Sequence, residues 1–322
     1  MNRSTITRRA FAALAITAPL FALAQDARPI EWVVGYPAGG GSDAVARAVA
    51  EQMAKTLGAS IIVNNKPGAA TNIAADYVAK SKVPGQMLFT ADFATLAANP
   101  SLFAKLPYDP DKDFVPIGLL ARFPLLLVVG PAVPATNFKE FVAWVKASKD
   151  PVNFASAGIG SPQHLAGELL AEKSGLKLQH VPYRGGAPAV QDLIGGQVPF
   201  ALMDSATVVQ HVQSGKLRAL GVASASRVKV LPDIPTLAEQ GLPGVEAFAW
   251  QGLVAPAATS PDQVAAFAKA LRSALESEPV KARYQALAIE ALPGSPQQMS
   301  DFAKAERIRW GTLIKAANVK LD

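Results

Sequence analysis

The sequence predicts a two-lobed α/β protein in which each lobe is a β-sheet flanked by helices. From residue 30 onward, short apolar runs rich in β-branched residues alternate with amphipathic helical patterns, an order typical of βαβ units. The alternation starts again near residue 125, which indicates a second α/β unit. The helical patterns after residue 260 have no strands of their own. We therefore expect them to return to the first lobe, so that the chain crosses between the lobes twice, at a hinge.

The first series of elements runs strand, helix, strand, helix, strand, which predicts a parallel sheet. The expected strands are Ile30–Gly35, Ile61–Asn64 and Met87–Ala91, and the expected helices are Ser42–Leu57 and Thr71–Ser81.

The second series repeats this order. Its expected strands are Leu125–Val129, Asn153–Ala155, Gln179–Pro182, Phe200–Asp204 and Leu217–Ala223. Its expected helices are Asn137–Lys149, Ser161–Ser174, Ala187–Gly195 and Thr207–Ser214. A last strand, Phe248–Ala255, precedes three helices at Pro261–Ser277, Pro279–Ala286 and Pro296–Ala317. The predicted division is residues 25–124 and 248–322 for lobe 1 and residues 125–247 for lobe 2.

Residues 1–24 have the pattern of an export signal. Arginines at positions 3, 8 and 9 precede an apolar stretch, and Ala22-Leu23-Ala24 matches an A-x-A cleavage site. The paired arginines fit either the general secretory route or the twin-arginine route, and the sequence leaves both open. With no cysteine for a disulfide or a lipid anchor, we expect a free periplasmic protein.

The formal net charge is +6, but the basic residues are scattered without runs. A nucleic-acid-binding surface requires clustered basic residues, so no nucleic-acid partner is expected.

A glycine-rich turn follows the first strand. Gly39, Gly40 and Gly41 let the backbone approach a ligand closely, and we expect Ser42 or Asp43 to cap the next helix. Backbone N–H groups at a helix start bind anions, because the positive end of the helix dipole lies there. The turn therefore predicts a binding site for a small carboxylate.

The second series contains a matching turn at residues 157–162. It includes Gly158, and Ser161 and Pro162 are expected as helix cap and first helical residue. Two such helix starts at equivalent positions predict a ligand cleft shared by both lobes.

Three further residues lie at carboxyl ends of predicted strands, where α/β sheets bind ligands. Tyr183 is a candidate ligand contact, with Arg184 a weaker one. Asp204 either caps the following helix or accepts a hydrogen bond from the ligand.

A hydrolase based on Ser161, His164 and Asp204 is the alternative from another functional class. The nucleophile pattern G-x-S-x-G is absent, since proline follows Ser161. The three histidines do not have metal-ligand spacing, and the glycine turn lacks the dinucleotide and phosphate-loop patterns. We therefore predict no enzyme activity, no metal and no cofactor.

Eight ordered motifs carry a resemblance to a known family. They are YPAGGGSD (residues 36–43), NKPGA (65–69), NP with LPYDP (99–110), AGIGS with His164 (157–164), YRG (183–185), DLIGGQ (192–197), LPDIPT (231–236) and Trp250. Across the mature chain, the sequence resembles the Bug-type periplasmic receptors of tripartite tricarboxylate transporters.

The resemblance implies a Venus-flytrap fold, capture of a small organic acid, and delivery to a membrane permease. The carried-over ligand contacts are Tyr36, Gly39, Gly40, Ser42 and Asp43 in lobe 1, and Gly158, Ser161, His164, Tyr183 and Asp204 in lobe 2. Side chains of the second loop and of segment Ala91–Ala97 would choose among acids. We expect a monomer. Two points stay open: which acid is bound, and whether the receptor serves a permease or acts in signalling.

Overall fold

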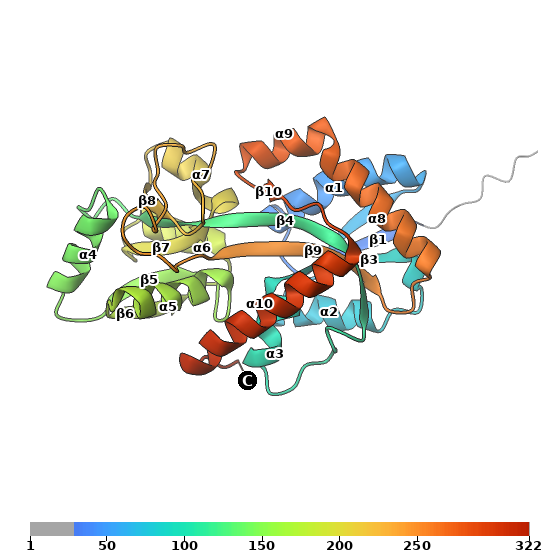
Figure 1. Ribbon diagram of the computed structural model, residues 1–322, viewed down its shortest axis with the longest axis horizontal. Coiled ribbons are helices and arrows are strands. Elements are labelled where there is room, and N and C mark those ends of the chain that lie inside the picture. Colours follow the sequence, from blue (N-terminus) through green and yellow to red (C-terminus); the bar gives the residue numbers. More distant parts are fainter. Residues whose placement is uncertain (1–28, 322) are drawn as a thin grey trace, which may run out of the picture.

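The computed structural model describes residues 29–321 (Figure 1). The predicted signal peptide, residues 1–24, lies outside them. Within this range, none of the helices has the length and apolar character required to span a membrane.

Ten strands of the described range form one sheet with the order β2-β1-β3-β9-β4-β7-β5-β6, and β8 and β10 pair with β4. The strands are β1 (Ile30–Val34), β2 (Ile61–Asn65), β3 (Met87–Asp92), β4 (Phe114–Val129), β5 (Val152–Ser156), β6 (Leu178–Pro182), β7 (Phe200–Asp204), β8 (Arg218–Val222), β9 (Phe248–Pro256) and β10 (Glu290–Ala291).

The α-helices are α1 (Gly41–Leu57), α2 (Asn72–Ala79), α3 (Asn99–Leu102), α4 (Phe138–Ala147), α5 (Pro162–Ser174), α6 (Gly186–Ile194), α7 (Ser205–Gln213), α8 (Pro261–Glu276), α9 (Glu278–Ala286) and α10 (Pro296–Ala316). Their bounds lie close to the predicted ones. A π-helical turn at Ala94–Ala98 leads into α3, and the sequence analysis predicted neither.

The parallel pairing predicted for the first series is confirmed, whereas the sheet as a whole is mixed. Strands β2, β1 and β3 are parallel, as are β6, β5 and β7. In contrast, β9 runs antiparallel to β3 and β4, and β4 runs antiparallel to β7 and β8. Parallel pairing holds among strands that helices link in βαβ units. Strands β4 and β9, which connect the two series, run antiparallel to their neighbours.

Strand β4 joins the two halves of the molecule. The first half contains β1, β2, β3 and β9, and the second half contains β5, β6, β7 and β8. Residues 114–124 of this 16-residue strand pair with β9, and residues 125–129 pair with β7 and β8. Figure 1 shows β4 and β9 side by side between the two halves. The two-lobed α/β architecture is thus confirmed, with the sheets of the two halves joined through β4. The exact lobe boundaries stay predictions.

The C-terminal helices pack on the N-terminal half. Helices α8 and α9 contact α1, and α10 contacts β4, α3 and the π-helical turn; Figure 1 shows α10 lying across the long strands. Buried Trp250 and Trp310 donate hydrogen bonds from their indole nitrogens to Glu306 of α10 (3.2 and 2.9 Å). Because Glu306 is itself only 6% exposed, these bonds compensate for burying its carboxylate.

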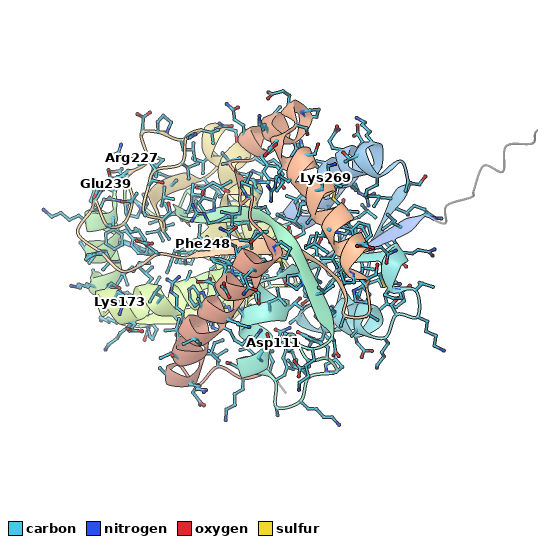
Figure 2. All side chains as sticks on the ribbon, turned by 45° about the vertical axis from the view of Figure 1, so that its right-hand side comes forward. Asp111, Lys173, Arg227, Glu239, Phe248 and Lys269 are labelled. Atoms are coloured by element: carbon cyan, nitrogen blue, oxygen red, sulfur yellow. The ribbon has the colours of Figure 1, made fainter. Side chains whose placement is uncertain are left out.

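The long excursion between β8 and β9 is held by polar contacts at the surface. Arg227 and Glu239 form an ion pair (3.0 Å), and Figure 2 shows them close together at the edge of the molecule. At the start of β9, Phe248 stacks on Phe302 and lies under the guanidinium group of Arg122. These contacts position the start of β9, the strand through which the chain returns to the first half.

Candidate functional site

The first glycine-rich turn leads directly into α1. This helix begins at Gly41, and its N-cap residue is Gly40, which has extended backbone (φ −82°, ψ 175°). Neither Ser42 nor Asp43 caps the helix, so that expectation is wrong. The helix therefore begins before the polar residues, and Asp43 falls within its first turn. The N–H of Gly39 donates a hydrogen bond to the Asp43 carboxylate (2.9 Å).

Asp43 is buried and stabilises this turn through its hydrogen bond with Gly39. It is 4% exposed, and Nε of Arg47 also donates to its carboxylate (2.9 Å). Burial acts to raise the pKa of Asp43, but the hydrogen bonds from Arg47 and Gly39 outweigh it and hold the pKa below its ordinary value. A carboxylate at a helix start is also favoured by the dipole. Its contact with a ligand stays a prediction.

Ser42 faces strand β9. Its hydroxyl accepts a hydrogen bond from Nε2 of Gln251, which lies 209 residues further along the chain and opposite Asp92 in the β3–β9 pair. Gln251 was not predicted from the sequence, because nothing local indicates that β9 pairs with β3.

Tyr36 and Asp92 form a buried pair beside the first turn. The Tyr36 hydroxyl donates to Oδ2 of Asp92, whose Oδ1 accepts from the N–H (3.0 Å) and hydroxyl (2.9 Å) of Thr95. Burial, and next the charge of Asp92, raise the pKa of Tyr36 well above its ordinary value, with a smaller contribution from Asp204 of the other half. Burial also raises the pKa of Asp92. Asp92 was not singled out in the sequence, although its position at the carboxyl end of β3 was a usable signal.

Segment Ala91–Ala97 is buried throughout. Thr95 is fully buried, and its hydroxyl contacts that of Thr71 (2.8 Å). Thr95 of this segment therefore stabilises the Tyr36–Asp92 pair through its two hydrogen bonds to Asp92.

The second glycine turn has the predicted cap. Ser161 is the N-cap of α5, its hydroxyl accepts from the N–H of His164 (3.2 Å), and Pro162 is the first helical residue. Ser156 holds the turn from the preceding strand, since its hydroxyl accepts from the N–H of Gly158 (3.0 Å). The expected local conformation is confirmed, and ligand contact by Gly158 and Ser161 stays a prediction.

His164 lies beneath this turn. It is 4% exposed and stacks on His180, with ring centroids 3.7 Å apart. Its Nδ1 accepts from the N–H of Gly160 (3.0 Å), and its Nε2 lies 3.4 Å from Glu168. These contacts give His164 a positioning role in the turn, while direct contact with a ligand stays a prediction.

Asp204 is the N-cap of α7, as one of its two predicted roles required. Its Oδ1 accepts from the N–H (3.0 Å) and hydroxyl (2.7 Å) of Thr207, and its Oδ2 accepts from Nε2 of Gln163 (3.1 Å). Burial raises the pKa of Asp204 despite these three bonds. Gln163 is a second site residue that was not predicted from the sequence, since its partner lies 41 residues away.

Tyr183 and Arg184 follow β6. The Tyr183 hydroxyl donates to Asp192 of α6 (2.8 Å), and burial, followed by this bond, raises its pKa to about 12. Arg184 is exposed. The hydroxyl of Tyr183 is thus engaged within its own half, and a role for this residue in ligand binding stays a prediction.

The two halves meet at these turns. A Cβ added at Gly41 would lie 3.4 Å from Cβ of Ala206, which lies in the first turn of α7, two residues after Asp204. A Cβ added at Gly160 would lie 2.2 Å from Cδ1 of Leu102 on α3. Since Gln163 of α5 also donates to Asp204, the starts of α1 and α5 both lie next to the start of α7.

Comparison with known proteins identifies the family. The family model "Tripartite tricarboxylate transporter family receptor" matches residues 45–319. The chain belongs to this receptor family.

Curated relatives agree with this assignment. The chain is 37% identical over 292 residues to a Pseudomonas sp. (strain P51) protein from the tcbD-tcbE intergenic region, a match covering 89% of this chain and 85% of the relative. It is 34% identical over 307 residues to protein BugT of Bordetella pertussis, covering 95% and 94%. The resemblance seen in the motifs is thus confirmed.

Solved structures of similar proteins share the receptor's fold. Periplasmic binding protein BugD has a TM-score of 0.82 and 36% identity, covering 91% of this chain and 98% of that one. MatC from Rhodopseudomonas palustris with bound malate has 0.82 and 34%, covering 90% and 99%. An R. palustris protein with adipate has 0.86 and 30%, covering 91% and 98%.

The receptor's geometry also bears on the hydrolase alternative. Tripartite tricarboxylate receptors are a solute-binding family, not an enzyme family. In this receptor, the hydroxyl of Ser161 accepts from the main-chain N–H of His164, while both ring nitrogens of His164 face other groups, Gly160 and Glu168. A general base must lie within hydrogen-bonding reach of its nucleophile, so nothing in this arrangement favours hydrolysis.

Proposed function

We propose that this receptor captures a small organic acid between its two lobes in the periplasm and delivers it to the membrane subunits of a tripartite tricarboxylate transporter. The proposal is carried by the position of two glycine-rich helix starts, at Gly41 and Ser161, which both lie next to the start of α7. Gly41 approaches Ala206, and Gln163 of α5 donates to Asp204. Backbone N–H groups and helix dipoles stabilise a carboxylate at such a position.

Two related proteins support the substrate class. MatC is described with bound malate and an R. palustris protein with adipate, and both are carboxylates. Capture without catalysis needs only two half-sites and closure around the ligand.

The test is a thermal-shift screen of the protein isolated from the periplasm of producing cells, against organic acids and their amides. Ligand at 100 times its dissociation constant adds about 2.7 kcal/mol to the free energy of unfolding, which raises the melting temperature by several degrees. We expect at least one acid to stabilise the protein and its amide not to. Equal stabilisation by the amide would contradict a carboxylate site.

Ser161→Ala separates binding from hydrolysis. Loss of the cap hydroxyl should weaken ligand binding by a small factor, whereas loss of a nucleophile would abolish turnover. Delivery is tested separately, by uptake of the identified acid into cells with and without this receptor. Unchanged uptake would remove the transport part of the proposal and leave the binding part intact.

A further inference from the structure

Two glutamine side chains at the site have an unsatisfied acceptor. Gln163 is 6% exposed and Gln251 is 5% exposed. In each, the amide nitrogen donates to a site residue, Asp204 or Ser42, whereas the buried oxygen Oε1 has no hydrogen-bond partner among the described residues. Leaving a buried amide oxygen unpaired costs free energy, so a partner from outside the chain is expected.

The orientation of the Gln163 amide follows from the chemistry of Asp204. Oδ1 of Asp204 accepts two hydrogen bonds from Thr207, and Oδ2 accepts the one from Gln163. These hydrogen bonds favour the ionised carboxylate, which only accepts, whereas burial favours the protonated form and raises the pKa of Asp204. Turning the amide over would place its oxygen against that carboxylate. With Asp204 ionised, the nitrogen of Gln163 therefore faces Asp204, and the oxygen of Gln163 remains free to accept.

The orientation of the Gln251 side-chain amide is not fixed in the same way. Its partner, the hydroxyl of Ser42, both donates and accepts. Either end of the Gln251 amide can face it, so only Gln163 carries the inference.

Gln163 also has the right position. It lies in the first turn of α5, two residues after the cap Ser161, at the helix start that the proposed function assigns to the ligand carboxylate. A donor within reach of its side chain would lie close to that carboxylate.

We propose that Oε1 of Gln163 accepts a hydrogen bond from a hydroxyl or ammonium group on the carbon beside the ligand carboxylate. Gln163 is then a specificity-determining residue, and the receptor prefers hydroxy or amino acids to the corresponding unsubstituted acids. The inference rests on the proposed function.

Isothermal titration with matched ligand sets tests it. The sets are succinate, malate and aspartate; propionate, lactate and alanine; and 3-phenylpropionate, 3-phenyllactate and phenylalanine. In at least one set, we expect the wild-type protein to bind a substituted acid about tenfold or more tightly than the unsubstituted one. Whether the hydroxyl or the ammonium member binds more tightly identifies the donor.

Variants assign the preference to Gln163. Gln163→Met keeps the length of the side chain but lacks the amide, and it should reduce the ratio of dissociation constants to near one. Gln191→Met, on the exposed face of α6, is the matched control and should keep the wild-type ratio. A melting curve establishes that each variant is folded. The wild-type ratio tests the inference even if Gln163→Met does not fold.

The outcomes separate the two proposals. If acids bind but the unsubstituted members bind equally well or better, or if Gln163→Met keeps the preference, the role of Gln163 is refuted and carboxylate capture stands. If no acid in the sets or in the wider screen binds, the proposed function fails and this inference with it.

Discussion

Adding a single methyl group at Gly160 should weaken ligand binding more than it weakens the fold. Gly160 has φ +74°, and a Cβ placed there would lie 2.2 Å from Cδ1 of Leu102. Gly160 lies in the glycine turn before α5 in the second half, and Leu102 lies in α3 of the first half. The overlap therefore arises where the two halves meet. The proposed function requires the lobes to open and to close around the ligand; on that basis, we expect opening to relieve the overlap and closure to restore it.

The magnitude follows from two contributions. An alanine with left-handed backbone costs about 1 kcal/mol in both open and closed forms. Forcing atoms well inside the normal carbon contact of about 3.5–4.0 Å resembles overpacking, which costs about 1–3 kcal/mol. Only the second contribution opposes closure. Gly160→Ala should therefore raise the dissociation constant by about 5- to 150-fold.

Gly175→Ala is the matched control at the other end of the same helix. Gly175 has φ +66° and no atom within 4 Å of an added Cβ. It should lower the melting temperature through backbone strain and leave the dissociation constant unchanged.

The assay is isothermal titration with the acid found in the screen, together with thermal melts. Leu102→Val, which shortens the overlapping side chain at a cost of about 1 kcal/mol, should recover much of the affinity lost in Gly160→Ala. The reasoning is refuted if Gly160→Ala binds as tightly as Gly175→Ala, or if the double variant shows no coupling.

Three further predictions concern stability. Asp204→Ala removes the cap of α7 and should lower the free energy of unfolding by about 1–2 kcal/mol in urea titrations, whereas Asp204→Asn should recover most of it; equal losses would argue against capping. Burial, and next the charge of a neighbouring histidine, lower the pKa of His180 from 6.5 to about 3, so between these pH values the unfolded chain binds a proton that the folded chain does not. Stability should therefore fall as the pH decreases through this window, by at most about 1.4 kcal/mol per pH unit, and His180→Gln should flatten that slope in melts from pH 7 to 4; an unchanged slope would assign it to other groups. Glu306→Ala leaves the buried indole N–H groups of Trp250 and Trp310 without their acceptor and should cost about 2–4 kcal/mol in urea titrations, while Glu306→Gln should cost clearly less; a neutral alanine variant would show that water replaces the carboxylate.

Strand β4 illustrates where prediction from sequence was incomplete. Only its last five residues, Leu125–Val129, were predicted, because Pro116 and Gly118 are unfavourable in a strand interior. The structure accommodates them at a register shift between these two residues, where β4 pairs with β9. That pairing comes from a segment more than 100 residues away, and local pattern carries no information about it.

The candidate site was also predicted only in part from the sequence. The cap at Ser161 and the proline after it follow from side-chain chemistry within four residues, and both were predicted. The cap of α1 was not, because three glycines in a row offer several helix starts of similar energy and the choice among them depends on packing.

The sequence by itself determined the alternation of elements, the two glycine-rich helix starts and the family, since each depends on residues close together or on ordered motifs along the chain. Only the tertiary structure decided which side chains complete the site. Asp92 approaches Tyr36, Gln163 approaches Asp204, and Gln251 approaches Ser42 through 56, 41 and 209 residues of separation, respectively. Such contacts form because the buried sheet brings distant strands into register, and each buried polar group must then find its hydrogen-bond partner among whatever residues that register supplies.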